Sequence, residues 1–155
     1  MARPIKKGLD YFPFDLNFFE DTKIMDLTYE YGVHGPYTYI LALTFIYEGG
    51  YYLSIPVKRF AQFICRRNGD SDRDSIDRTE EILWKCAELG LFDKAMMEKE
   101  IFTSKAIQRR YAAVTARRKH EKRYYWLLKK NDELFSTDSA VEEATPTCED
   151  SAAET

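Results

Sequence analysis

Residues 89–130 read LGLFDKAMMEKEIFTSKAIQRRYAAVTARRKHEKRYYWLLKK, and this stretch decides the expected fold. A helix is expected to end at Gly90, because glycine favours the position just after a helix. Two short runs of strand-forming residues follow, at 91–92 and 101–103, with a charged turn between them. A new helix is then expected to start at 103–104. Helix, β-hairpin and helix in this order are typical of the second half of a winged helix, a nucleic-acid-binding fold.

The preceding part of the chain supplies the elements that a winged helix places before its hairpin. Apolar residues recur at helical spacing, and short aromatic and β-branched runs indicate strands. Helices are expected at 18–31, at 37–48, from 54–56 to about 66 and at 74–89, and a strand at 51–55. The sequence therefore predicts a mainly α-helical winged helix-turn-helix with a small β-hairpin wing and an extended basic carboxy-terminal helix.

The composition fits one domain with a substantial core, since 45% of the 155 residues are hydrophobic and 15% are aromatic. No apolar run reaches the roughly 18 residues of a membrane helix, and no signal-peptide pattern follows the basic start, so we expect a cytoplasmic protein. Of the three cysteines, Cys65 and Cys86 are expected to be buried thiols, and Cys148 lies far from both. The spacing predicts no zinc site, and no catalytic or cofactor motif is present.

Charge is segregated along the chain although the net charge is only −3. Residues 105–130 contain ten Lys and Arg and one acid, whereas residues 131–155 contain eight acids and no base. Such a basic segment is typical of nucleic-acid binding, and the tail either competes with DNA for it or only solubilises the chain. Three parts are expected: a winged-helix domain at 1–118, a basic and aromatic helical extension at 119–130, and an acidic disordered tail at 131–155.

The last helix is expected to pack on the body only at its start. Ile107, Tyr111 and Val114 form an apolar stripe, and the next position on that face is Arg118. Packing should therefore end near Ala116, after which cations point to all sides of the helix. Bound phosphates would relieve the repulsion between these like charges, so this part is the main candidate DNA contact. The alternative is a charged helix end exposed to solvent.

The candidate DNA-binding residues are all basic and fall into two groups. The principal phosphate ligands are Arg109, Arg110, Arg117, Arg118, Lys119, Lys122 and Arg123. Supporting contacts are expected from Arg66, Arg67, Arg78, Lys85, Lys94, Lys99 and Lys105. The helix at 74–89 would be the recognition helix, but its outward face carries four acids and two bases, which opposes an approach to phosphates. A solvated or protein-facing helix is the alternative there.

Two aromatic segments flank the candidate binding region. The first segment consists of Tyr124, Tyr125, Trp126, Leu127 and Leu128. We expect it to stack on unpaired bases, to form a partner or self-association patch, or to fold back on the body. The other, residues 1–17, is expected to be an extended arm that packs its aromatic residues, Tyr11, Phe12 and Phe14, onto the body. The bases of this arm either enter a DNA groove or belong to a solvated terminus; they are Arg3, Lys6 and Lys7.

Several short motifs together resemble a known domain. They are MARPIKKGLDYFPFD at 1–15, FFED at 18–21, IYEGGYYL at 46–53, LGLFDK at 89–94, IFTS at 101–104 and IQRRY at 107–111. In combination they resemble an amino-terminal winged-helix domain of unknown function from phage and mobile-element proteins, some of them related to DnaD-like replication initiation proteins. The resemblance covers roughly residues 1–118 and implies a winged-helix fold and a role near DNA replication. It implies no catalytic residues.

The leading hypothesis is a non-enzymatic DNA-binding protein of a phage or mobile element that acts in replication initiation or its control. The expected partner is duplex or single-stranded DNA, with replication proteins and a second copy of the chain as further candidates. No cofactor and no membrane are expected. The alternative hypothesis is an interaction module without DNA binding, which dimerises or docks a replication or regulatory protein through the acidic face of residues 74–89 and through residues 124–128.

Overall fold

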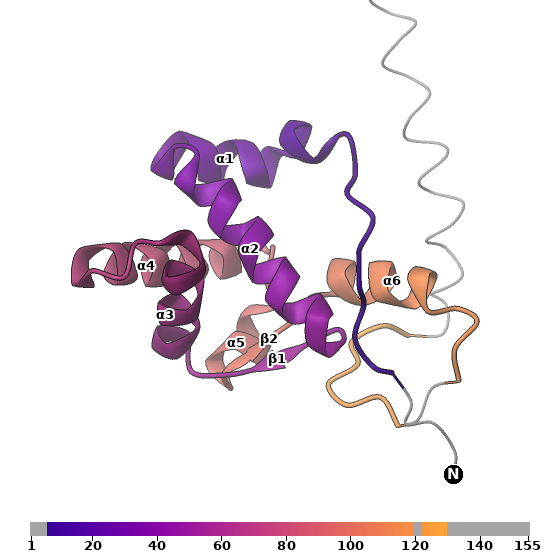
Figure 1. Ribbon diagram of the computed structural model, residues 1–155. Coiled ribbons are helices and arrows are strands. Elements are labelled where there is room, and N and C mark those ends of the chain that lie inside the picture. The colour runs from indigo at the N-terminus through magenta and orange to yellow at the C-terminus, as the bar shows by residue number, and fades with distance from the viewer. Residues whose placement is uncertain (1–5, 120–121, 130–155) are drawn as a thin grey trace, which may run out of the picture.

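The computed structural model describes residues 6–119 and 122–129, which form a mainly helical domain with one two-stranded antiparallel sheet (Figure 1). In chain order the elements are the 3-10 helix η1 (Phe18–Glu20), α1 (Thr22–Tyr31), α2 (His34–Gly49), β1 (Leu53–Ser54), α3 (Val57–Asn68), α4 (Arg73–Leu89), α5 (Lys94–Glu98), β2 (Ile101–Phe102) and α6 (Lys105–Val114). The predicted mainly helical class with a small sheet is confirmed. Arg3, Cys148 and the predicted acidic tail at 131–155 lie outside the described residues.

Local hydrogen bonds set most helix ends. The side chains of Asp72 and Ser104 cap α4 and α6 by accepting backbone N–H bonds from the first turn of each helix. Asp21 caps α1 in the same way, so the helix predicted from residue 18 begins with η1 and becomes α-helical only after this cap. Gly69 and Gly90 end α3 and α4 in the left-handed conformation that glycine adopts without steric cost.

The core lies around α2, which contacts α1, α3 and α4 (Figure 1). Ile46 and Tyr47 of α2 are buried. Phe102 of β2 is fully buried between the rings of Phe60 in α3 and Phe92, with ring centroids 4.6 and 5.5 Å away. The aromatic side chains of three separate elements therefore close the core, and each such ring buries a large apolar area. Cys65 and Cys86 are buried, as predicted.

The predicted pairing of residues 91–92 with 101–103 is wrong. β2 pairs instead with β1, with Leu53 opposite Phe102 and Ser54 opposite Ile101. The backbone N–H of Leu91 bonds to the carbonyl of Cys86 and thus completes the end of α4. The expected charged turn is the helix α5. Within the described residues, no hairpin wing therefore separates α4 from α6.

The predicted extension of the last helix is also wrong. α6 ends at Val114, and the buried hydroxyl of Thr115 donates to the carbonyl of Tyr111. The backbone N–H of Arg118 then bonds to the carbonyl of Thr115 and closes a turn. Residues 122–129 run back along the body without helical structure. This carboxy-terminal segment is thereby placed against the domain, whereas an extended helix would have carried it away from the body.

The amino-terminal arm packs onto the end of α2. The backbone N–H of Leu9 bonds to the carbonyl of Tyr47 at 2.7 Å, and the ring of Phe12 stacks on the ring of Tyr47 at 4.8 Å. Leu9 is buried, which extends the core to this arm. Packing of the arm is thus confirmed for Phe12, whereas Tyr11 and Phe14 are exposed, contrary to the prediction.

Two features are absent from the described residues, 6–119 and 122–129. No helix there combines the length and the hydrophobicity that a membrane crossing requires. No three His, Cys, Asp or Glu side chains in this part of the chain are grouped as ligands of a metal ion.

Gly8 is predicted to be required for the packing of the arm. A Cβ at this position would lie 1.9 Å from the backbone oxygen of Glu48, so Gly8→Ala must displace the arm. We expect a loss of about 1–3 kcal/mol in the free energy of unfolding, measured by chemical denaturation. Gly49→Ala is the matched control, because a Cβ at Gly49 would meet no heavy atom within 4 Å. Equal stability of the two variants would contradict the close approach.

Candidate nucleic-acid interface

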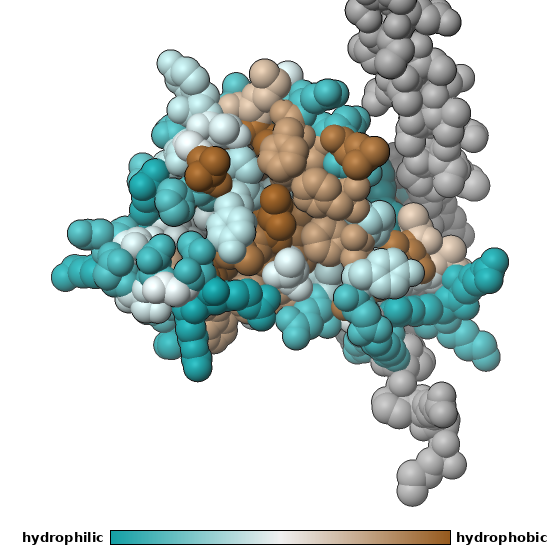
Figure 2. Space-filling model, turned by 45° about the horizontal axis from the view of Figure 1, so that its top comes forward, coloured by the Kyte–Doolittle hydropathy of each residue, from teal (hydrophilic) through white to brown (hydrophobic). Residues whose placement is uncertain are grey.

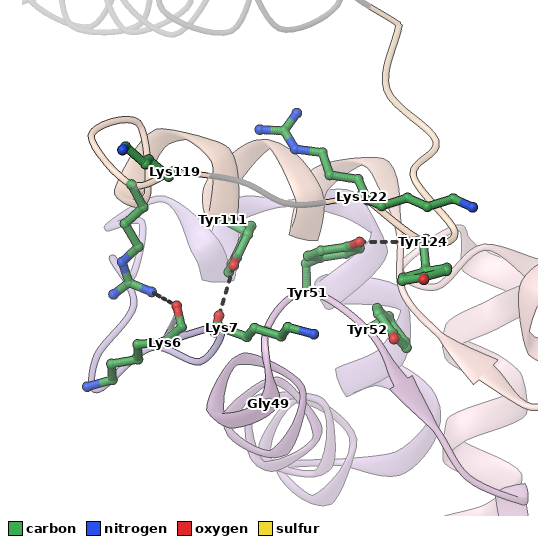
Figure 3. A pocket seen from close by; sticks show the side chains of 12 residues that line it. Lys6, Lys7, Gly49, Tyr51, Tyr52, Tyr111, Lys119, Lys122 and Tyr124 are labelled. Atoms are coloured by element: carbon green, nitrogen blue, oxygen red, sulfur yellow. Dashed lines mark hydrogen bonds between the residues drawn. The ribbon is translucent and has the colours of Figure 1, made fainter. Parts of the chain in front are cut away.

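A basic pocket lies where the two ends of the described chain meet (Figure 3). Its walls come from the amino-terminal arm, the end of α2 with the loop to β1, the end of α6 and the carboxy-terminal segment. The lining residues are Lys6, Lys7, Gly49, Gly50, Tyr51, Tyr52, Tyr111, Arg118, Lys119, Lys122, Arg123 and Tyr124. Six of these twelve residues are Lys or Arg, and the others supply aromatic rings or backbone. The cavity measures about 80 Å³.

Gln108 of α6 fixes the carboxy-terminal wall. Its fully buried side-chain amide donates from Nε2 to the hydroxyl of Thr103 at 3.1 Å and to the carbonyl of Tyr125 at 2.9 Å. Its Oε1 accepts from the backbone N–H of Leu127 at 2.7 Å. The Thr103 hydroxyl donates in turn to the carbonyl of Tyr51 at 2.7 Å. One side chain therefore ties α6, the start of β1 and residues 122–129 together.

Aromatic packing reinforces this wall. The hydroxyl of Tyr51 donates to the carbonyl of Tyr124 at 2.7 Å, and its ring meets the edge of Trp126 at 5.0 Å. The rings of Tyr52 and Tyr125 make a second edge contact, also at 5.0 Å. Trp126 packs against the core and Leu128 is buried. Of the three alternatives for residues 124–128, folding back on the body describes Trp126 and Leu128, whereas Tyr124 and Tyr125 remain exposed.

The amino-terminal wall is held by α6 and the turn after it. The hydroxyl of Tyr111 donates to the carbonyl of Lys7 at 2.8 Å. The guanidinium of Arg118 donates to the carbonyls of Lys6 and Gly8, at 3.2 and 2.9 Å. Arg118 is half-buried and lies after the end of α6, and these contacts explain why a cation follows the apolar stripe in the sequence. Packing therefore continues past Ala116, where the sequence predicted its end.

Three lysines of the pocket face solvent with their charges available. Lys7, Lys119 and Lys122 are exposed, and none of them forms an ion pair with an acid among the described residues. In Figure 3, Lys119 and Lys122 lie on one side of the pocket and Lys7 on the other, with Tyr51 and Tyr111 between them. Three cations around one small cavity form a region of positive potential that attracts anions.

The other pocket cations have partners. Lys6 is ion-paired with Asp10, and this hydrogen bond lowers the pKa of the Asp10 carboxyl. The guanidinium of Arg123 lies 4.2 Å from the ring centroid of Trp126. Burial raises the pKa of Tyr51 to about 12 and also raises the pKa of Tyr111. Both phenols are therefore neutral at physiological pH and do not offset the positive charge of the pocket.

Several predicted phosphate ligands are instead engaged within the domain. Arg110 is ion-paired with Asp15 at 2.9 Å and donates to the hydroxyl of Tyr47 at 3.2 Å. Arg78 donates to the carbonyl of Tyr31, and Lys85 pairs with Glu30 of α1 and with Glu88. The guanidinium of Arg67 lies 3.8 Å from the ring centroid of Phe45. These side chains join elements of the fold, which sequence patterns cannot distinguish from solvent-facing cations.

The remaining predicted residues are exposed and lie outside the basic pocket; they are Arg66, Lys94, Lys99, Lys105, Arg109 and Arg117. Conversely, no pattern in the sequence predicted a binding role for Tyr51, Tyr52, Tyr111 or Gln108. The motif GGYY at 49–52 signalled the end of a helix and the start of a strand, but not the position of Tyr51 and Tyr52 at the pocket. Gln108 carried no signal, because a glutamine beside the apolar stripe of a helix is ordinarily solvent-facing.

Comparison with known proteins places the chain in a family. Residues 11–107 match the sequence profile of the family described as Lin1244/Lin1753-like, N-terminal. The chain belongs to this family. It is also 32% identical, over 125 residues, to the uncharacterized phage-related protein Lin1244/Lin1753 of Listeria innocua serovar 6a. The aligned residues are 78% of this chain and 38% of that protein, so the chain spans well under half the length of this relative. No solved structure matches the chain.

The family match confirms the predicted resemblance to a phage-associated domain, whereas the relation to DnaD-like proteins stays a prediction. The match also divides the basic pocket. Its amino-terminal boundary, residue 11, follows the arm lysines, and its last residue, Ile107, precedes Gln108. The α2–β1 side of the pocket therefore lies within the family region. The arm that carries Lys7 and the carboxy-terminal wall lie outside it.

Gln108→Leu is predicted to release residues 122–129 from the body. It removes every hydrogen bond of the amide, and we expect a loss of about 1–3 kcal/mol in the free energy of unfolding. Trp126 reports the release directly. The chain has two tryptophans, Trp84 and Trp126, so the measurement is made in a Trp84→Phe background. The fluorescence of Trp126 should then shift to the red when the segment is released. Lys105→Ala, at the exposed start of α6, is the control and should change neither quantity. An unshifted emission in Gln108→Leu would show that the amide does not hold this segment.

Proposed function

We propose that the chain is a non-enzymatic DNA-binding protein of a phage or mobile element, acting in the cytosol in replication initiation or its control. The basic pocket carries the proposal. It brings six Lys and Arg side chains from the two ends of the described chain around one cavity. Such clusters bind phosphates through counterion release, largely without regard to sequence. The phage-related protein that the chain resembles supports the biological setting. The replication role rests on the predicted relation of this family to DnaD-like replication initiation proteins.

The arrangement of α3 and α4 supports a helix-turn-helix interpretation. The two helices pack together across a short turn that ends at the cap Asp72, and β1 precedes α3 while β2 follows α4. In a helix-turn-helix of this kind, α4 would enter the major groove. The two bases of α4, Arg78 and Lys85, are held against α1. The acids on its outward face stay exposed and would repel phosphates. We therefore propose that DNA is held by the basic pocket and that α4 takes no part in contacting it.

Removal of the three available pocket lysines is predicted to weaken DNA binding and its salt dependence together. Lys7→Ala, Lys119→Ala and Lys122→Ala in one chain should lower the slope of log K against log salt by about 1 or more, because each lost phosphate contact removes nearly one unit. Fluorescence anisotropy across a salt titration measures this slope. The variant keeps the hydrogen bonds of Arg118 and Gln108, so the fold should be retained.

The matched control removes the same charge elsewhere. Lys94→Ala, Lys99→Ala and Lys105→Ala together take away three exposed lysines on α5, after it and at the start of α6. We expect this variant to keep most of the affinity and slope of the unchanged chain. An equal loss in both triple variants, or no DNA binding by the unchanged chain, would contradict the proposed site.

An apolar face favours the interaction module as a second candidate function. Figure 2 shows hydrophobic side chains gathered over η1 and the neighbouring segments. Leu16 is 99% exposed and lines a cavity of about 730 Å³ together with Phe18, Leu43 and several charged side chains. Phe19 is 59% exposed, and its ring lies 5.0 Å from that of Phe18. Contiguous exposed apolar surface of this kind marks interaction sites. This face differs from the surfaces that the sequence suggested, because Trp126 and Leu128 are packed against the body.

Self-association through the apolar face is predicted to depend on Leu16 and Phe19. The variant with Leu16→Asp and Phe19→Asp should be monomeric in light scattering at concentrations at which the unchanged chain forms a dimer, because two charges oppose burial of this face. Tyr29→Asp is the control, since Tyr29 is 94% exposed and does not line the cavity. A monomeric unchanged chain at all concentrations would rule out this form of the second function.

A further inference from the structure

We infer that the basic pocket takes a single-stranded nucleic acid, with one backbone phosphate among the lysines and adjacent bases stacked on the rings of Tyr124 and Tyr125. This inference rests on the proposed function and specifies the form of nucleic acid that the same pocket binds. Three observations carry it: the size and walls of the cavity, the exposure of two tyrosine rings beside it, and the conformation that holds these rings in place.

The cavity is too small for a whole nucleotide. Its volume of about 80 Å³ is well below the roughly 300 Å³ at which pockets for complete small ligands begin. A single phosphate group is of a suitable size, and cations stand on both sides, Lys7 on one wall and Lys119 and Lys122 on the other (Figure 3). A flexible single strand can insert one phosphate between the two walls of the pocket. The backbone of a duplex is a rigid convex surface and reaches such a recess less readily.

Two exposed tyrosine rings offer stacking surfaces, that of Tyr124 in the lining of the pocket and that of Tyr125, the next residue in the chain. Tyr124 is 52% exposed and Tyr125 is 44% exposed. The Nζ of Lys122 lies over the ring of Tyr124, 5.5 Å from its centroid, so a cation and an aromatic ring are adjacent. This combination matches a nucleotide, whose phosphate takes the cation and whose base takes the ring. Bases in a duplex are already stacked on one another, and only an unpaired strand presents them to these rings.

The backbone holds these rings in advance of binding. The carbonyl of Tyr124 accepts from the Tyr51 hydroxyl, and the carbonyl of Tyr125 accepts from the amide of Gln108. Tyr125 has a φ of 56°, a left-handed conformation that costs free energy for a residue with a side chain. Such conformations persist where surrounding contacts impose them, and they cluster at functional sites. The backbone that carries both rings is therefore fixed by hydrogen bonds before a strand binds, which reduces the entropy that stacking must overcome.

The experiment compares four oligonucleotides with the full chain at fixed salt. Fluorescence anisotropy is measured with labelled single-stranded DNA, single-stranded RNA, and the DNA and RNA duplexes of the same sequence and length. We expect the unchanged chain to bind at least one single strand more tightly than either duplex. The DNA and RNA arms identify which strand is preferred, and both outcomes support the inference. Tighter binding to a duplex than to both single strands would overturn it.

Variants at the rim test the stacking directly. Tyr124→Ala with Tyr125→Ala should weaken single-strand binding about tenfold or more and leave duplex binding unchanged, because only the stacked bases are lost. Tyr124→Phe with Tyr125→Phe keeps the rings and should restore the affinity. Tyr29→Ala removes a tyrosine exposed on α1 and is the matched control. Trp126 fluorescence in the Trp84→Phe background verifies that the carboxy-terminal segment is still in place.

The failure of this inference differs from the failure of the proposed function. If the lysine variant loses binding to every oligonucleotide while the alanine variant at Tyr124 and Tyr125 binds as the unchanged chain does, the stacking role is wrong and DNA binding by the pocket stands. If the unchanged chain binds none of the four oligonucleotides, both are wrong. Loss of single-strand binding in the alanine variant that the phenylalanine variant does not restore would also count against stacking.

Discussion

The side-chain amide of Gln108 is the interaction on which the candidate site depends. It is fully buried, and its donors and acceptor bond to Thr103, Tyr125 and Leu127. A buried amide is costly unless its hydrogen bonds are made, so the chain after α6 has to return to the body to supply them. That return brings Tyr124 against Tyr51 and forms one wall of the basic pocket. A single polar side chain in the core thereby determines where a distant charged segment lies.

The cations of this chain divide by chemistry into structural and available ones. Arg110 and Arg118 hold the amino-terminal arm, and Arg67 lies on the ring of Phe45. The planar guanidinium, with several fixed donors and a weakly hydrated face, suits carbonyls and aromatic rings inside a fold. Lys7 and Lys119 remain exposed around the pocket, where strongly hydrated and mobile ammonium groups suit phosphate contacts. The arginines thus build the surface on which the lysines present their charge.

Local signals predicted the helices well, and nonlocal pairing was not predictable. The caps Asp72 and Ser104 act within one turn of their own helix, so the starts of α4 and α6 follow from neighbouring residues. The partner of β2 does not follow from neighbouring residues, because Leu53 and Phe102 pair although α3, α4 and α5 lie between them in the sequence. Two strand-like runs near each other in the sequence suggested a hairpin, but the backbone N–H groups of the first run, Leu91 and Phe92, bond to the carbonyl of Cys86 at the end of α4.

The sequence by itself determined that charge would be concentrated in residues 105–130 and that a helical core would carry it, since both follow from composition and local spacing. Only the tertiary structure decided which cations surround the pocket. Arg118 bonds to the carbonyl of Gly8, 110 residues away, and Tyr111 bonds to that of Lys7. Contacts at such separation depend on the packing of the whole domain. The arm lysines, which the sequence favoured as part of a solvated terminus, therefore became part of the candidate site through packing alone.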